Sequence, residues 1–347
     1  MLQAIERLDY TSKIKISVAA IIPLYNGAPF IRESLESVIS QSEPVEEIIV
    51  VNDGSTDDGA EIVRELAKHY PIHLITQTNG GIGSARNRGI AECKSTHIAL
   101  LDQDDIWYCD HIEVLKKPFV SQSVANLGVV YANLDRIDLS GRMVCHNFLD
   151  QLPNIHPKVS LIQCLSQDMF ILPGASLIDR EAFSKVGRFD ERLSGYEDDD
   201  LFLRIFSAGY RMHYIRKKSV LKWRIYSGST SYSAKMSKSR MIYFRKLINL
   251  YPDEPRLHLF WARDAIVPRF FGLVQHDFVE GLRFRDLPRV TQAWSDIQEI
   301  STFMHKSVSR RIKLVAPLMG LLYRSPFRSL TRGLLSFASR RRRKKRK

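Results

Sequence analysis

Three aspartates stand within four positions, Asp102, Asp104 and Asp105, directly after an apolar run that ends at Leu101. Carboxylates this close together repel one another, and a divalent cation relieves that repulsion. Oxygen ligands suit Mg²⁺ or Mn²⁺, and Mg²⁺ usually takes one or two carboxylates and completes its shell with waters and substrate phosphates. The spacing therefore predicts a metal site. The structural alternative is an acidic turn that caps the next helix.

A second acidic run, Glu197 to Asp200, opens a segment that continues as Leu-Phe-Leu-Arg-Ile. Acids at the N-terminus of a helix are stabilised by the helix dipole, which gives two of the four a structural role. Four acids are more than a helix start requires. A carboxylate at a buried helix start can remove a proton from a substrate hydroxyl, so the run also predicts a general base.

Two turn-rich segments contain further candidates. The turn Asn79 to Gly83 leads to Arg86, and a Gly-rich loop with an arginine can contact a diphosphate. A plain tight turn is the alternative. Because this turn follows the third expected strand rather than the first, we reject a nicotinamide-binding fingerprint. Asp53 lies in Asn-Asp-Gly-Ser after an apolar run, where turn chemistry explains most of the pattern.

The elements that position these motifs alternate between two hydrophobic patterns. Apolar runs predict strands over 14–23, 45–51, 72–77 and 97–101, and helical spacing predicts helices over 28–40, over 58–69 and from the Gly-rich turn to Ala91. This alternation predicts a parallel α/β sheet with helices on both faces, which binds ligands outside the carboxyl ends of its strands. Asn26, Asp53 and the aspartates from Asp102 to Asp105 follow three of these strands.

The remaining chain divides by composition. Residues 128–235 mix strand-like runs with turns, and residues 236–300 have helical patterns. We expect an α/β domain over 1–235, a helical extension over 236–309 and a basic amphipathic tail over 310–347. The four cysteines form no metal-binding or disulfide pattern, and we expect neither a secretory signal nor a membrane-spanning helix.

The net charge of +13 is concentrated in that tail. Residues 301–347 hold 15 Lys and Arg, eight of them consecutive from Arg340 to Lys347, and no acid, so the first 300 residues carry −2. Interspersed leucines and arginines predict a helix that lies on an anionic membrane surface. A solvated, disordered end and a nucleic-acid-binding tail are the alternatives, and the last is the weakest, because no aromatic residue interrupts the basic run.

Taken together, the motifs resemble those of the family 2 inverting glycosyltransferases, which have the GT-A fold. The segments that carry the resemblance over about residues 14–231 are IIPLYN from Ile21, VVNDGSTDDG from Val50, NGGIGSARNRGI from Asn79, LLDQDDIW from Leu100 and GYEDDDLFLRI from Gly195. The resemblance implies a Rossmann-like mixed sheet of the nucleotide-diphospho-sugar transferase type, followed by a helical C-terminal extension. It also implies an acceptor-side segment at Pro173–Ser176 and Val186–Leu193.

The resemblance implies a role for individual residues. The nucleotide site would be lined by Pro23, Tyr25 and Asn26, with Asp53 on the nucleobase. The diphosphate and ribose would contact Asn79, Gly80, Arg86 and Arg224. Asp102 would contact the ribose or the sugar and assist the metal, Asp104 would hold Mg²⁺ or Mn²⁺, and Asp105 could do either.

On the acceptor side, the resemblance makes Asp198 the base, uncertain by one residue within the run, and directs Glu197 toward the acceptor. Trp107 would wall the sugar pocket. One position departs from the family pattern: Tyr226 stands where many relatives have a histidine that helps to bind metal or phosphate.

The expected function is metal-dependent, inverting sugar transfer from a nucleotide-diphosphate sugar to a glycan or lipid-linked acceptor. We expect it to serve cell-surface polysaccharide or lipopolysaccharide synthesis, peripherally on the cytoplasmic face of the cell membrane and without nucleic acid. The alternative is a non-catalytic partner subunit that binds a nucleotide sugar. The intact set of carboxylates argues against that alternative, and Tyr226 is the point in its favour.

Overall fold

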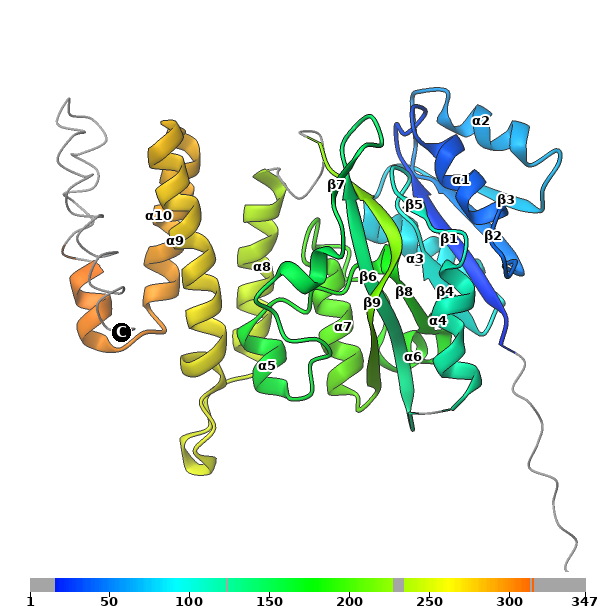
Figure 1. The fold of residues 1–347 in the computed structure, drawn as a ribbon. Helices are drawn as coiled ribbons and strands as arrows, with labels where there is room; N and C mark the ends of the chain where they lie inside the picture. The colour runs from blue at the N-terminus through cyan, green and yellow to red at the C-terminus, as the bar shows by residue number, and fades with distance from the viewer. Residues whose placement is uncertain (1–15, 123, 227–233, 313, 315–347) are drawn as a thin grey trace, which may run out of the picture. The chain divides into compact units, whose positions relative to one another are not determined.

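The first half of the chain alternates strands and helices, as the hydrophobic pattern predicts. The structure is a computed structural model that describes residues 16–122, 124–226, 234–312 and 314 (Figure 1). The alternating elements are β1 (Val18–Leu24), α1 (Ile31–Ile39), β2 (Glu47–Asn52), α2 (Gly59–Leu66), β3 (Ile72–Thr76), α3 (Ile82–Glu92) and β4 (His97–Leu100). Each lies within a few residues of its predicted range.

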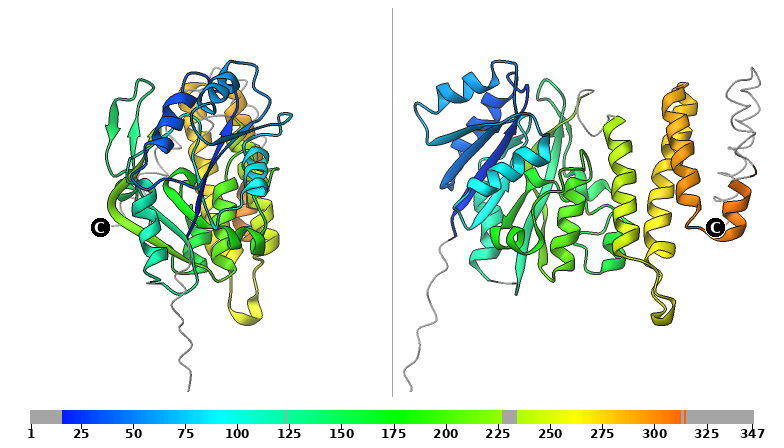
Figure 2. Two further views of the ribbon diagram at one scale, coloured as in Figure 1. Left: turned by 90° about the vertical axis from the view of Figure 1, so that its right-hand side faces the viewer. Right: turned by 180° about the vertical axis from the view of Figure 1, so that it is seen from behind.

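These four strands form the parallel part of a mixed sheet with the order β3-β2-β1-β4-β8-β6-β9-β5. The chain builds outward from β1 to β3 and then returns through α3 to β4 on the other side of β1. Right-handed crossovers therefore place α3 on the opposite face from α1 and α2, and the view from behind in Figure 2 shows α3 in front of the strands. The loops after β1 and β4 diverge at this point of reversal, where such sheets bind ligands.

The second half of the sheet is mostly antiparallel. β8 pairs antiparallel with both β4 and β6, whereas the long strand β9 runs parallel to β6 with three register shifts. The elements here are β5 (Ile106–Trp107), α4 (His111–Val120), β6 (Leu127–Ile137), β7 (Met143–Cys145), η1 (Phe148–Gln151), α5 (Leu161–Ser166), η2 (Pro173–Ala175), β8 (Ser176–Asp179), α6 (Arg180–Val186), α7 (Glu197–Ser207) and β9 (Arg211–Arg224). The strand-like run from Phe170 becomes a strand only at Ser176, because the residues from Pro173 form a tight 3-10 turn first.

The core explains why β1 reads as an unbroken apolar run. All seven residues of β1 are buried, because helices cover both faces of the sheet. On one face α3 approaches β1 so closely that a Cβ atom built on Gly89 would lie 2.3 Å from a methyl carbon of Ile21. A glycine is therefore required where this helix crosses the strand.

The C-terminal region is helical, as predicted. Its elements are α8 (Ala234–Leu250), η4 (Pro255–Leu257), the π-helical turn η5 (Ala262–Ile266), α9 (Val267–Phe284) and α10 (Leu287–Ser301). The chain forms two compact units, Met1–Tyr243 and Phe244–Lys347, so the division falls inside α8. The second unit has its own core, in which the ring of Phe244 lies 5.4 Å from that of Phe270 and 5.6 Å from that of Phe303.

No helix in the described ranges is both long enough and apolar enough to cross a bilayer. The predicted basic tail lies almost entirely outside the described residues, which end at residue 314.

Candidate functional site

A cleft of about 790 Å³ opens at the carboxyl ends of β1, β2 and β4. Every residue to which the resemblance assigns an individual donor, metal or base role lines it, apart from Trp107, whereas of the two acceptor-side segments only Pro173, Gly174, Glu191 and Leu193 do. The predicted residues found here are Pro23, Tyr25, Asn26, Asp53, Asn79, Gly80, Arg86, Asp102, Asp104, Asp105, Glu197, Asp198 and Arg224. The cleft also contains Asp168, Phe170, Trp223 and Met236, which sequence reasoning did not assign.

The cleft is strongly acidic. Among the described residues, its lining includes nine Asp and Glu side chains but only two arginines, and neither lysine nor histidine. A nucleotide diphosphate would be repelled by this charge unless a cation accompanied it. The composition of the lining thus agrees with the predicted need for a divalent metal.

Arg86 joins the two acid motifs of the cleft. It lies on α3 with 2% of its side chain exposed, and its two terminal nitrogens donate hydrogen bonds to Asp102 at 2.7 Å and to Glu197 at 2.9 Å. Burial opposes the guanidinium charge, but the two carboxylates outweigh it and raise the pKa of Arg86. Arg86 thus bridges two carboxylates, and its predicted contact with the diphosphate stays a prediction.

Asp104 is the half-buried carboxylate best placed for a metal. Burial and the neighbouring Asp102 raise the pKa of Asp104 to about 6. The hydroxyl group of Tyr226 donates a hydrogen bond to this carboxylate, and burial together with Asp104 raises the pKa of the phenol to about 12. Tyr226 thus reaches the predicted metal ligand, although a neutral phenol is itself a poor ligand.

The other residues of this loop shape it. Gln103 exchanges two hydrogen bonds with the backbone of Tyr25, at 2.7 and 3.0 Å, which ties the loop after β4 to the loop after β1. Asp105 is buried and accepts the backbone N–H of Arg224 at 2.9 Å. Burial, followed by the charges of Asp104 and Asp102, raises the pKa of Asp105 well above its usual range. Asp105 therefore ties this loop to the end of β9, and its predicted contact with metal or sugar stays a prediction.

Arg224 does not present a free guanidinium to the cleft. Its side chain is 3% exposed, and its nitrogens donate to the carbonyl oxygens of Asp104 and Leu139 and to the carboxylate of Glu33. These bonds brace the Asp104 loop from behind. The diphosphate contact predicted for Arg224 would require the guanidinium to leave them.

The structure distinguishes the four acids at the start of α7. Glu197 pairs with Arg86, Asp199 accepts the backbone N–H of Met169 at 2.5 Å and the hydroxyl group of Tyr243 at 2.7 Å, and Asp200 pairs with Arg204 at 2.9 Å. Asp198 lines the cleft, and its carboxylate accepts the backbone N–H of the next residue. Burial, followed by the charges of Glu197 and Asp199, raises the pKa of Asp198 well above its usual range. The arrangement favours Asp198 as the base.

The Gly-rich turn closes on Asp53. This buried carboxylate accepts the backbone N–H groups of Gly80 at 2.9 Å and of Gly81 at 2.8 Å, together with the side-chain amide of Gln77. Asn26, which has a φ of 48°, accepts the backbone N–H of Thr56 at 2.8 Å. Asp53 therefore stabilises the Gly-rich turn and also lines the cleft. Its predicted contact with a nucleobase stays a prediction.

Trp107 does not wall the cleft. It is 3% exposed, stacks on His111 with 4.0 Å between ring centroids, and donates its indole N–H to the carbonyl oxygen of Gly174. Trp223, at the end of β9, lines the cleft instead. The prediction for Trp107 is wrong because a position next to the acid motif in sequence does not determine which side of the strand the ring occupies.

Two residues that line the cleft have strained backbone conformations that the sequence does not predict. Phe170 has a φ of 52° and Tyr196 a φ of 65°, and both line the cleft. Such conformations cost bulky residues on the order of 1–3 kcal/mol each and gather at functional sites. No composition signal indicates them, because glycine would be the expected residue at both positions.

The donor set fits a divalent cation that shares its ligands with a substrate. The described ranges contain no cluster of three or more His, Cys, Asp or Glu side chains that would enclose a metal. Asp104 is available as one carboxylate ligand, and the second oxygen of Asp102 lies in the same loop. This matches the habit of Mg²⁺, which takes one or two carboxylates and completes its shell with substrate phosphates and water.

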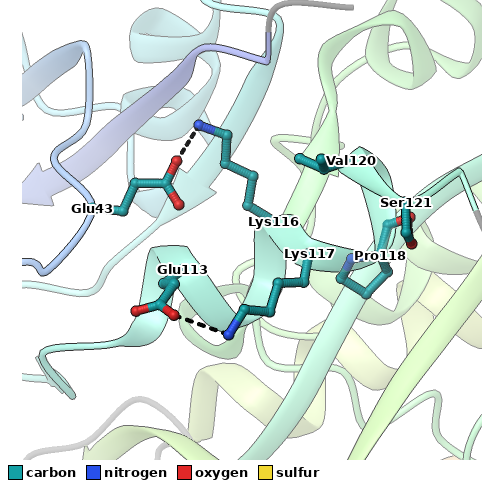
Figure 3. Close-up of a pocket in the computed structure, with 7 residues that line it drawn as sticks. All are labelled: Glu43, Glu113, Lys116, Lys117, Pro118, Val120 and Ser121. Carbon is teal, nitrogen blue, oxygen red and sulfur yellow. Dashed lines mark hydrogen bonds and ion pairs between the residues drawn. The ribbon is translucent and has the colours of Figure 1, made fainter. Parts of the chain in front are cut away.

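A second pocket, of about 440 Å³, lies beside α4 and away from the strand ends (Figure 3). Its lysines are already paired, Lys116 with Glu43 at 2.5 Å and Lys117 with Glu113 at 2.9 Å. None of the residues that carry the family resemblance lines this pocket.

Comparison with known proteins agrees with this geometry. The family model "Glycosyl transferase family 2" matches residues 19–187. An uncharacterized glycosyltransferase of Rickettsia bellii is 32% identical over 241 residues, which cover 68% of this chain and 34% of that protein. The chain thus spans about a third of the length of this relative.

Two solved structures share the fold. S. aureus TarS 1-349 in complex with UDP-GlcNAc has a TM-score of 0.63 at 18% identity and covers 92% of both chains. The mannosyltransferase PcManGT from Pyrobaculum calidifontis, in complex with GDP-Man and Mn²⁺, has a TM-score of 0.54 at 19% identity, with 90% of this chain and 82% of that chain covered.

The fold and the cleft define a glycosyltransferase of the GT-A class. Within that class, residues 19–187 form a domain of glycosyltransferase family 2.

Proposed function

We propose that the protein is a metal-dependent, inverting glycosyltransferase that moves a sugar from a nucleotide-diphosphate sugar to a hydroxyl group of a glycan or glycolipid. The observation that carries this proposal is the Arg86 bridge, because it holds Asp102 and the Glu197–Asp198 pair together in one cleft. Nucleotide sugars in the TarS and PcManGT structures support a donor of this kind.

The strand ends would hold the donor. Asp53 would contact the nucleobase, and Asp102 would contact the ribose or the sugar. Asp104 would hold Mg²⁺ or Mn²⁺, which when bound supplies positive charge beside the departing diphosphate. Because the described lining of the cleft has only two arginines, both engaged by other groups, the chain itself offers the diphosphate little positive charge.

Asp198 would act on the acceptor. It accepts the proton of the acceptor hydroxyl as that oxygen forms a bond to the anomeric carbon, while the bond to the nucleoside diphosphate breaks. Attack from the side opposite the leaving group inverts the configuration, so an α-linked donor gives a β-glycoside. Burial and the neighbouring acids raise the pKa of Asp198, which makes the ionised carboxylate a stronger proton acceptor than an exposed one.

We further propose that the enzyme serves cell-surface polysaccharide or lipopolysaccharide synthesis, peripherally on the cytoplasmic face of the membrane. The support is the charge distribution, with 15 basic residues and no acid in residues 301–347. A lipid-linked acceptor would make such a location useful.

The test is a thermal-shift panel of UDP-, dTDP- and GDP-sugars, each with Mn²⁺ and with EDTA, followed by a product assay with the donor that binds. A ligand at about 100 times its Kd stabilises the native state by about 2.7 kcal/mol, which is readily measured. A metal-dependent shift with one nucleotide, and turnover of that donor, are expected. Binding without turnover of any acceptor or water would instead favour the partner-subunit alternative.

A further inference from the structure

Two half-buried aromatic residues, Phe170 and Trp223, line a part of the cleft that the proposed donor contacts do not use. A third ring, that of Phe148 in η1, packs against both, with centroid distances of 6.2 Å to Phe170 and 5.8 Å to Trp223. We call Phe148, Phe170 and Trp223 the aromatic wall. Phe170 and Trp223 present an apolar, partly exposed surface inside an otherwise acidic cleft, with Phe148 packed against them, so the wall can accept a different part of the substrate than the carboxylates do.

The aromatic wall is fixed next to both acid motifs. The backbone N–H of Met169, one residue before Phe170, donates to Asp199, which directly follows the proposed base. The backbone N–H of Arg224, one residue after Trp223, donates to Asp105. A group stacked on the wall would therefore be held close to Asp198 and to the end of the donor site.

An aromatic wall of this kind suits a sugar ring. A pyranose has a face of C–H groups, which packs on the face of an aromatic ring, while its hydroxyl groups point sideways to polar partners. The left-handed backbone of Phe170, with a φ of 52°, indicates that the fold accepts strain to present this ring.

Arg136 gives the aromatic wall a charge. It lies on β6 opposite Trp223 in the β6–β9 register, with its guanidinium carbon 4.8 Å from the centroid of Phe148 and 5.7 Å from that of Trp223. Its buried Nε has no hydrogen-bond partner, and no ion pair to Arg136 occurs in the described ranges. The adjacent Asp135 is engaged elsewhere, by Tyr108 and His146.

The lack of an ion pair distinguishes Arg136 from the two arginines that line the cleft. Arg86 and Arg224 are neutralised by carboxylates at 2.6–2.9 Å, whereas the guanidinium of Arg136 packs on the rings of Phe148 and Trp223 and has no carboxylate partner among the described residues. A planar guanidinium with free donors matches the two oxygens of a carboxylate or a phosphate group.

We propose, resting on the proposed function, that the aromatic wall and Arg136 form the acceptor subsite, and that the acceptor sugar stacked there carries an anionic group. The shared chemistry is an anionic oxygen pair on a sugar ring, which either a uronic acid or a sugar phosphate provides. Arg136 would bind that pair, and the wall would hold the ring with a hydroxyl group toward Asp198.

The experiment uses the full-length protein and matched pairs of probes. The acidic probes are oligosaccharides that contain glucuronate or galacturonate, and sugar 6-phosphates; their partners are the carboxyl-reduced and dephosphorylated forms. Binding is followed by tryptophan fluorescence, with Trp223→Phe to identify the ring that responds. We expect at least one acidic probe to bind ten or more times more tightly than its neutral partner, and the uronate and phosphate pairs to show which anion is used.

Variants of Arg136 and Trp223 separate the contribution of the charge to probe binding from that of the aromatic wall. Arg136→Gln should abolish the preference for the acidic probe, Arg136→Lys should retain part of it, and Trp223→Ala should weaken both members of the pair. Arg142→Gln, which removes an exposed arginine paired with Asp138, is the matched control and should keep the preference. Thermal unfolding confirms that each variant is folded.

Equal affinity for every acidic probe and its neutral partner, or a preference that survives Arg136→Gln, overturns the inference. Nucleotide-sugar binding, measured on the same samples, separates this result from failure of the proposed function. If the wild-type protein binds a nucleotide sugar but shows no acidic preference, only the acceptor inference falls. If it binds no nucleotide sugar, the proposed function falls.

Discussion

Asp198 and Asp199 are chemically identical neighbours with different surroundings. Both line the cleft, but the carboxylate of Asp199 is held by hydrogen bonds from the backbone of Met169 and the hydroxyl group of Tyr243. Asp198→Asn removes the base without touching the donor contacts, so we expect turnover to fall by about 10²–10⁴ while nucleotide binding persists. Single-turnover kinetics and ligand-induced thermal shifts measure the two quantities.

The matched control is Asp199→Asn. Its amide cannot accept both hydrogen bonds that Asp199 accepts, so this variant should lower the melting temperature and leave the turnover of the folded fraction largely intact. The opposite pattern, with Asp198→Asn active and Asp199→Asn folded but inactive, would move the base by one residue.

Asp104 gives metal binding a pH dependence. Burial and Asp102 raise the pKa of Asp104 to about 6, and a cation binds the deprotonated form. Mn²⁺ affinity in the presence of a nucleoside diphosphate should therefore weaken as the pH falls through 6, by roughly tenfold between pH 7 and pH 5 from this carboxylate alone. Electron paramagnetic resonance of free Mn²⁺ gives the affinity directly.

Tyr226→Phe tests whether Asp104 is the group that titrates. The tyrosine hydroxyl lowers the pKa of Asp104 by its hydrogen bond, so its removal should move the midpoint of metal binding to higher pH. The nucleotide phosphates titrate identically in both proteins and cancel in the comparison. An unchanged midpoint would assign the pH dependence to the nucleotide instead of the protein.

At the residue scale, most residues of the cleft could be predicted from the sequence, but the ion pairs between them could not. The acids, the glycines and Arg86 were predicted because their types and spacing are unusual. The contact of Arg86 with Glu197 spans 111 residues, and no local pattern encodes it. The prediction for Trp107 is wrong for a related reason: adjacency to an acid motif is visible in sequence, whereas the side of a strand end that a ring occupies is set by packing.

At the scale of elements, the close crossing of α3 over β1 makes a sharp prediction. Gly89→Ala places a methyl group 2.3 Å from a carbon of Ile21, so α3 must shift. We expect a loss of about 1–3 kcal/mol in the free energy of unfolding, measured by denaturant titration.

Gly83→Ala, in the same helix, is the matched control for this crossing. Its new methyl group would find its nearest neighbour at 3.6 Å, an ordinary contact, so the substitution should be close to neutral. If both variants lost the same stability, the cause would lie in helix α3 as a whole and not in its contact with β1.

The alternating elements up to β4 were predictable because each apolar run is short and bounded by turn residues. β9 was not, since Arg211–Arg224 is rich in Lys and Arg and only five of its 14 residues are buried. Its pairing with β6 brings together residues more than 80 positions apart and includes three register shifts. Tertiary pairing, rather than local propensity, makes this segment a strand.

At the scale of the whole molecule, the separation of charge predicts where the protein resides. The first 300 residues carry −2 and the last 47 carry +15. Vesicles that contain anionic lipids should bind the full-length protein at low salt, and neutral vesicles should not, because each basic residue near an anionic surface contributes about 1 kcal/mol.

Deletion of Arg340 to Lys347 removes eight of these charges and should weaken vesicle binding by at least about a hundredfold, with nucleotide-sugar binding unchanged. Co-sedimentation at several salt concentrations measures the effect. Retention of vesicle binding after the deletion, or a preference of the full-length protein for DNA over anionic vesicles, would contradict the membrane assignment of the tail.

The bridge made by Arg86 also bears on how such enzymes can be recombined. One guanidinium fastens the loop after β4 to the start of α7, so these segments behave as a single interlocking part although nearly a hundred residues separate them. A chimera that takes its acceptor half from a relative inherits a foreign partner for Arg86. Transferring α3, the loop from Asp102 to Asp105 and α7 together would preserve both ion pairs of Arg86. Chimeras that exchange these three segments as a set should therefore fold and function better than chimeras joined at a single point in the chain.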